Sequence, residues 1–316
     1  MKRQNLTPKT TITGPVLDFD FPGLQIGIAE YEEGPTGCTV IAFDETAELH
    51  VDERGGAPYA VGDFGVTDAI CLTGGSVYGI EAVAGVNRAI LEARDNNVSW
   101  ESLAVVAGAV IYDFGPRDNA IHPDAELGYV AWQAKRPGRF PLGAQGAERS
   151  ATAGKGFHFD RAEQSGQGAA FRQIGDTHIA FFTVTNPVGA IHDRSGRVVC
   201  GHLDPKTGER EPLLADLDAK IELSLKGPSA NTTLSVLVID QKLPDPGALG
   251  RIARQVHASM ARAIQPFHMA VDGDVLFAVN TNRVDSPLHE MLLATTASEL
   301  AWDAVLASVP VLGPGS

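Results

Sequence analysis

The chain has 316 residues, 44% of them hydrophobic, and a formal net charge of −14 from 39 acidic and 25 basic residues. A chain of this length can bury a substantial core within one large layered domain. Because no cluster of Lys or Arg longer than a pair offsets the acidic charge, nucleic acid and anionic membranes are poor candidate partners.

The three cysteines, Cys38, Cys71 and Cys200, lie far apart and form no C-x-x-C pair. This spacing argues against a disulfide framework or a zinc knuckle. The first ten residues precede a polar segment rather than the apolar core of a signal peptide, and no run of eighteen apolar residues occurs. We therefore expect a soluble cytoplasmic protein.

Short apolar runs separated by many of the 34 glycines are typical of strands joined by tight turns. In chain order, the predicted strands are 24–29, 38–43, 68–72, 103–111, 178–184, 197–200, 232–239 and 275–279. Helical spacing of apolar residues predicts helices at 77–94, 246–264 and 287–306. Since the strands cluster rather than alternate strictly with helices, we predict a single α+β domain, 1–316, built as an αββα sandwich of mixed sheets flanked by helices.

The segment 203–231 is polar, contains Pro and Gly, and ends in GPSAN directly before a strong strand. It is predicted to be an exposed loop where the chain can be cut.

Familiar catalytic and cofactor motifs are absent from the sequence. GGSVYG at 74–79 has Tyr78 where a serine nucleophile elbow needs glycine. Lys155 in TAGKGF lacks the spacing of a phosphate-binding loop, and no dinucleotide fingerprint follows a strand. No H-E-x-x-H is present, and Asp272-Gly273-Asp274 lacks the further oxygen ligands of a calcium loop. We expect neither a cofactor nor a metal.

Asn231-Thr232 has the layout of a self-processing site. When a hydroxyl residue is the chain terminus, its own α-amine, with a pKa of roughly 7.7–8.0, can accept the hydroxyl proton. Such a terminus arises mid-chain when the Thr hydroxyl attacks the preceding carbonyl and the resulting ester is hydrolysed. By spacing alone, however, an Asn-Thr pair that opens a strand is ordinary turn chemistry.

Several long stretches carry a resemblance to a known family. They include FDFPGLQIGIAEYEEGPTGCTVI (19–41), DAICLTGGSVYGIEAVAGV (68–86), SATAGKGFHFDR (150–161), TNPVGAIHDRSG (185–196), NTTLSVLV (231–238) and RQVHASMARAIQPFHMAVDGDVLFAV (254–279). The sequence resembles the 6-aminohexanoate-oligomer (nylon-oligomer) hydrolases, which group with the β-peptidyl and DmpA-type aminopeptidases among the N-terminal-nucleophile (Ntn) hydrolases.

The resemblance implies cleavage after Asn231 into fragments 1–231 and 232–316. Thr232 would then be the nucleophile and, through its amine, the general base. It further implies that a cationic Lys155 keeps this amine neutral and stabilises developing negative charge, and that the Asn186 side chain donates to the oxyanion. Backbone amides near the 74–76 turn are expected to assist as oxyanion donors. Ala230 departs from the family, which would have glycine there.

The remaining implied roles concern orientation and binding. Asp272 and Asp274 are expected to orient the Thr232 hydroxyl and amine, and Tyr78 to lie near the substrate amide, with a core aromatic as its alternative. The implied partners are a small oligoamide substrate and further copies of the chain, in a tetramer of cleaved protomers. Three other functions remain open: a β-peptidyl or L-amino acid aminopeptidase, a Thr-dependent acyltransferase, and an uncleaved, non-catalytic scaffold.

Overall fold

The computed structural model describes residues 6–156, 159–213 and 231–310. A sheet of ten strands bends into two layers at the long strand β3 (Thr36–Gly55). The first half of β3 pairs with β2 (Leu24–Tyr31) and β5 (Val66–Thr73), and its second half pairs with β17 (Gly273–Val284). The β3–β5 register shifts between Ala42 and Ala47, where the strand leaves one layer for the other.

Each layer has its own strand order. The first contains β2, β3, β5, β6 (Val106–Val110) and β4 (Ala60–Val61), with β7 (Arg136–Pro137) beside β2. The second runs β11 (Gln167–Ile174), β12 (Thr177–Asn186), β15 (Thr232–Gln241), β17 and the end of β3. Within the second layer β15 and β17 are parallel, which brings the starts of both strands to one edge of the molecule.

Smaller elements surround this sheet. They are the strands β1 (Val16–Asp18), β8 (Arg139–Pro141), β9 (Thr152–Ala153), β10 (Glu163–Gln164), β13 (Ala190–His192), β14 (Val198–Cys200) and β16 (Ile264–Gln265), and the 3-10 helices η1 (Trp100–Ser102), η2 (Gly146–Glu148), η3 (Phe159–Arg161) and η4 (Met260–Arg262).

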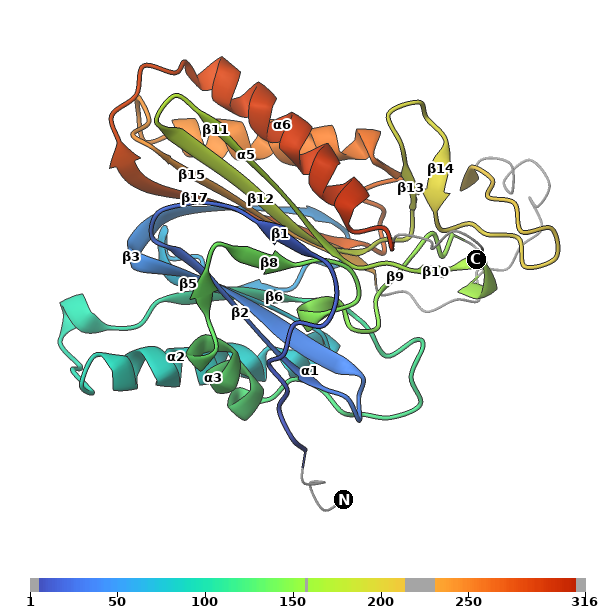
Figure 1. Ribbon diagram of the computed structural model, residues 1–316, viewed down its shortest axis with the longest axis horizontal. Coiled ribbons are helices and arrows are strands. Elements are labelled where there is room, and N and C mark those ends of the chain that lie inside the picture. Colours follow the sequence, from blue (N-terminus) through green and yellow to red (C-terminus); the bar gives the residue numbers. More distant parts are fainter. Residues whose placement is uncertain (1–5, 157–158, 214–230, 311–316) are drawn as a thin grey trace.

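Helices cover the outer face of each layer (Figure 1). Leu234, Val236 and Val238 of β15 face the core between the layers, whereas Leu237 and Ile239 face α5 (Ala248–Ser259) and α6 (Glu290–Ala307). On the other layer, α2 (Glu81–Ala93) and α3 (Ala125–Gln133) cover the sheet. Because strand side chains alternate between faces, each strand contributes to two cores. The predicted αββα sandwich is confirmed.

The predicted helices need two corrections. The helix at 77–94 is interrupted at Ile80, which separates α1 (Ser76–Gly79) from α2. Gly79 packs closely on Gly74, and an added Cβ would lie 1.7 Å from the Gly74 carbonyl oxygen, so only glycine fits at the end of α1. The helix at 246–264 ends at Ser259, since Ile264 pairs with Ile191 of β13.

The predicted strands all recur, although 103–111 shortens to β6. The elements α3 and β11 were not predicted. Segment QGAAFRQI of β11 has small residues because α6 packs closely on it: a Cβ at Gly168 would lie 1.9 Å from the Ala304 carbonyl oxygen. Of the predicted loop 203–231, positions 214–230 lie outside the described residues.

Candidate active site

Thr232 lies at the start of β15, between two neighbouring strands of the second layer. The strand register pairs it with Asn186 at the end of β12, and Asn231 forms a parallel bridge with Asp272 next to β17. All four residues are buried, with Thr232 retaining 7% of its exposure. The sheet therefore brings together residues that are far apart in the sequence.

The peptide between Asn231 and Thr232 is held on both sides. The Thr232 hydroxyl donates to the Asn231 carbonyl oxygen at 2.6 Å, and the Gly273 N–H donates to the same oxygen at 2.7 Å. The Asn231 N–H donates to the Val271 carbonyl at 3.2 Å. Negative charge that develops on the Asn231 oxygen during attack would thus meet a fixed donor. Sequence reasoning missed Gly273 because a backbone donor has no residue signature.

Lys155 and Asn186 form a single hydrogen-bonded unit. The Lys155 ammonium donates to the Thr152 carbonyl at 2.8 Å, the Asn186 carbonyl at 2.9 Å and the Asn186 Oδ1 at 2.8 Å. These three close acceptors match the three donors of an ammonium group, and a fourth, the Pro187 carbonyl, lies farther away at 3.5 Å. The Asn186 amide nitrogen donates to the Tyr112 carbonyl at 3.0 Å. Tyr112 was not among the predicted site residues.

Burial shifts the pKa values of the charged groups in the site toward their neutral forms, and neighbouring charges partly offset these shifts. Burial lowers the pKa of Lys155 to about 7, while the carboxylates of Asp272 and Glu148 and the three oxygen acceptors favour its charged form. Burial and the nearby Asp274 raise the pKa of Asp272 to about 6, against backbone N–H donors and Lys155. Burial also raises the pKa of Glu148, which sequence analysis did not single out.

The two aspartates bind backbone groups around the nucleophile. Asp272 accepts the N–H groups of Val188 at 3.2 Å and Met269 at 3.1 Å. Asp274 accepts the Thr233 N–H at 2.7 Å through Oδ1. Their expected direct orientation of the Thr232 hydroxyl and amine stays a prediction.

Amides of the 74–76 turn are engaged within the fold. Those of Gly74, Gly75 and Ser76 donate to the Gly37 carbonyl, Asp113 Oδ1 and the Ile111 carbonyl at 3.0, 2.8 and 2.9 Å. These three amides are therefore not free to act as oxyanion donors. That another amide near the turn does so stays a prediction.

Tyr78 lies at the surface and not in the core. It is 63% exposed, and its ring centroid lies 6.5 Å from that of Phe114, which lies 5.7 Å from that of Tyr112. The three rings form a row that ends at Tyr112, whose backbone carbonyl accepts a hydrogen bond from the Asn186 side chain. Its expected contact with the substrate amide stays a prediction.

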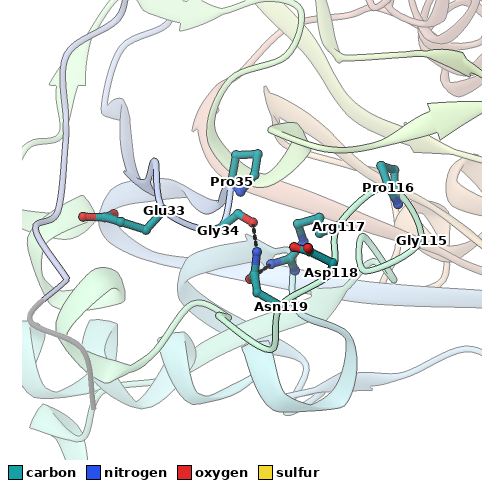
Figure 2. A pocket seen from close by; sticks show the side chains of 8 residues that line it. All are labelled: Glu33, Gly34, Pro35, Gly115, Pro116, Arg117, Asp118 and Asn119. Atoms are coloured by element: carbon teal, nitrogen blue, oxygen red, sulfur yellow. Dashed lines mark hydrogen bonds between the residues drawn. The ribbon is translucent and has the colours of Figure 1, made fainter. Parts of the chain in front are cut away.

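A cavity of about 530 Å³ lies beside the segment that follows Tyr112 (Figure 2). Its walls are Glu33, Gly34, Pro35 and residues 115–119. The Asn119 side-chain amide donates to the Gly34 carbonyl at 2.7 Å and ties the two walls together. Arg117 pairs with Asp113, so Glu33 and Asp118 give the cavity an acidic character.

Within residues 6–156, 159–213 and 231–310, no three His, Cys, Asp or Glu side chains gather into a group that could hold a metal. All three cysteines are buried free thiols. No helix in these ranges is long and apolar enough to cross a membrane.

Comparisons with known proteins agree on one family. The model of peptidase family S58 matches residues 19–309. A 6-aminohexanoate-oligomer endohydrolase of Paenarthrobacter ureafaciens is 45% identical over 315 residues, which cover 96% of this chain and 88% of that protein.

Two solved structures share the fold at 16% identity. A β-aminopeptidase of Burkholderia sp. has a TM-score of 0.66 and covers 95% of this chain and 89% of its own. The L-aminopeptidase D-Ala-esterase/amidase of Ochrobactrum anthropi, described as a variant of the Ntn hydrolase fold, has a TM-score of 0.63 and covers 95% and 87%. The fold is thus that of the Ntn-type aminopeptidases.

Proposed function

Because the chain belongs to peptidase family S58, we propose that this amide hydrolase cuts itself between Asn231 and Thr232 and then uses the freed Thr232 to cleave linear 6-aminohexanoate oligomers. The observation that carries the proposal is the position of the Thr232 hydroxyl, 2.6 Å from an Asn231 carbonyl oxygen that the Gly273 N–H also holds.

Self-cleavage proceeds by an acyl shift. The Thr232 oxygen bonds to the Asn231 carbonyl carbon, and the Gly273 N–H stabilises the oxyanion. The carbon–nitrogen bond then breaks, the hydroxyl proton passes to the Thr232 nitrogen, and an ester remains. Water hydrolyses the ester, which leaves a carboxylate on Asn231 and restores the Thr232 hydroxyl beside a free amine.

Turnover uses the same atoms on an external amide. The Thr232 amine accepts the hydroxyl proton as the oxygen attacks the substrate carbonyl, and this proton leaves with the departing amine. The Lys155 charge keeps the freed Thr232 amine neutral. In both self-cleavage and turnover it also stabilises the negative charge that develops on the attacked carbonyl. Water then hydrolyses the acyl-enzyme. A Thr-dependent acyltransferase would form this intermediate and resolve it with an amine.

A second candidate is an aminopeptidase of the same family. The acidic cavity formed by Glu33, Asp118 and their neighbours favours it, because carboxylates would hold the ammonium end of a substrate. An endohydrolase cuts internal amide bonds and does not need to bind the ammonium end of its substrate. We also propose that cleaved protomers assemble as a tetramer in the cytoplasm, which light scattering of the matured protein and cell fractionation test.

Intact mass spectrometry tests self-cleavage. The parent is expected to give two fragments, the second beginning at Thr232, whereas Thr232→Ala gives one intact chain. Thr233→Ala is the matched control, since Thr233 is a buried hydroxyl residue one position along the same strand. A parent chain that stays intact through prolonged incubation would support the non-catalytic scaffold instead.

Oligomers with and without a blocked amine distinguish the two activities. A 6-aminohexanoate oligomer with an acetylated terminus is expected to be cleaved about as fast as the free oligomer, because an endohydrolase does not bind the ammonium group. Cleavage of the free oligomer only, with residues released one at a time, would establish the aminopeptidase.

A further inference from the structure

A group of titratable side chains, His268, His257 and Asp52, lies next to Asp274 and does not touch Thr232 through any hydrogen bond of the described residues. His268 precedes β17 and directs both its ring Nδ1 and its backbone N–H at Asp274 Oδ2, at 2.8 and 3.2 Å. The other oxygen of Asp274 accepts the Thr233 N–H at 2.7 Å. A single carboxylate therefore connects His268 to the backbone next to Thr232.

The backbone of His268 is in an uncommon conformation. Its φ is +59°, in the left-handed region, which residues other than glycine seldom adopt. The conformation places the ring and the N–H on the same carboxylate oxygen. Backbone strain of this kind persists where the surrounding structure enforces it, and it clusters at functional sites.

The ring of His257 in α5 packs edge-to-face against the ring of His268. The two ring centroids lie 4.5 Å apart at 86°, and Phe267 stacks on His268 at 3.9 Å. His257 itself is fixed through its Nδ1, 2.9 Å from Asp52 Oδ2. Asp52 in turn accepts a bond from Arg54 at 2.8 Å.

Within the described residues, the ring of His268 makes its hydrogen bond to Asp274. Its Nε2 is buried and has no partner among the described residues, so Asp274 is the group that its side chain serves. Because the carboxylate accepts, Nδ1 carries the proton in this arrangement. Asp274 is fully buried, so its carboxylate depends on donors within the protein to hold its orientation.

We propose that His268 is a positioning residue for the scissile peptide, a role that rests on the function proposed above. By fixing Asp274, it fixes the Thr233 amide and so keeps the Thr232 hydroxyl aligned with the Asn231 carbonyl. The role differs from catalysis, since within the described residues the hydrogen bonds of His268 go to Asp274 and not to the Thr232 hydroxyl or the Asn231 carbonyl.

Two substitutions separate this role from general packing. His268→Gly removes the ring and tolerates positive φ, whereas His268→Asn also tolerates positive φ and retains a donor near the Nδ1 position. We expect fragments to appear about 10- to 100-fold more slowly from freshly refolded His268→Gly precursor, as loss of one hydrogen bond to a charged group implies. His268→Asn is expected to restore most of the parent rate.

The chain offers a matched control in His178. Its Nδ1 and N–H likewise contact one carboxylate, that of Asp240, at 2.6 and 2.8 Å, near the end of β15 opposite to Thr232. His178→Gly should therefore leave the cleavage rate unchanged. If His268→Gly does not fold, His268→Ala replaces it, because alanine also lacks a side-chain donor and adds no charge beside Asp274.

Any other result would overturn either the positioning role of His268 or the proposed function. If the parent cleaves and His268→Gly cleaves as fast, the positioning role is wrong and the proposed function stands. The role is also overturned if folded His268→Gly and His268→Asn cleave equally slowly, because the side-chain donor at position 268 is then not responsible. It is likewise overturned if His178→Gly cleaves as slowly as His268→Gly. A parent that never cleaves refutes the proposed function first.

Discussion

Lys155 and Asp272 bring opposite charges to the buried end of β15, and each is shifted toward its neutral form. Burial lowers the pKa of Lys155 to about 7 and raises that of Asp272 to about 6. Above about pH 6 Asp272 is ionised, and at or below about pH 7 Lys155 is charged. Both charges coexist only in a narrow interval, which makes the proposed chemistry sensitive to pH.

We expect the self-cleavage rate to follow a bell-shaped pH profile. It should rise as Asp272 loses its proton near pH 6 and fall as Lys155 loses its proton above about pH 7, because the proposed roles need a carboxylate and a cation. Initial rates of fragment appearance, measured from mildly acidic to mildly basic buffers, check this. In Asp272→Asn the acidic limb should vanish, and a flat parent profile would contradict the assignment.

How far the site could be predicted depends on the kind of group. Thr232, Lys155 and Asn186 were predicted from resemblance, and the structure brings them together through strand register and the Lys155–Asn186 bonds. Neither spacing nor composition predicts that register, because residue 155 and residue 232 are distant in sequence. The Gly273 N–H and the Tyr112 carbonyl are backbone groups, to which any residue type could contribute.

At the scale of elements, apolar runs predicted most of the strands that are buried on both faces, although they missed the buried first half of β11. The second half of β3 escaped prediction because its outward face is polar and paired. Leu49 faces the core between the layers, whereas Asp52 on the same strand binds His257 of α5. A strand with one face covered by paired charges resembles a loop in amino-acid composition. Its pairing with β17 and its contact with α5 determine that it forms a strand.

The α2–α3 contact gives a prediction about packing. A Cβ at Gly85 of α2 would lie 1.8 Å from the Ala125 carbonyl oxygen, and one at Gly128 of α3 would lie 1.9 Å from that of Ala82. Gly85→Ala should therefore lower the free energy of unfolding by about 1–3 kcal/mol, although alanine favours a helix by about 1 kcal/mol. Urea denaturation measures the change.

Ala84, exposed on the same helix, provides the control. Ala84→Gly should cost about 1 kcal/mol, from helix propensity alone. If Gly85→Ala instead stabilised the protein by a similar amount, close packing of the two helices would not be the reason for glycine at position 85.

At the scale of the whole molecule, the proposed cut separates strands that stay interleaved. β15 and β17 belong to fragment 232–316, whereas β12 and β3 on either side of them belong to fragment 1–231. The register joins β15 to β12 over eight residue pairs, from Ile179–Ile239 to Asn186–Thr232, and β17 to β3 over eight more. Helices α5 and α6 of the second fragment also share a buried core with β12.

We therefore expect the two fragments to remain one particle after cleavage. Separation would break two strand ladders and expose the apolar faces of β15 and β17, whose burial contributes about 1.5–3 kcal/mol for each large side chain. Size-exclusion chromatography of matured protein in native buffer should give one peak containing both fragments, and urea should be needed to resolve them. Uncleaved Thr232→Ala is the control for size. Fragments that elute separately without denaturant would mean that the ladders do not hold the second layer together once the chain is cut.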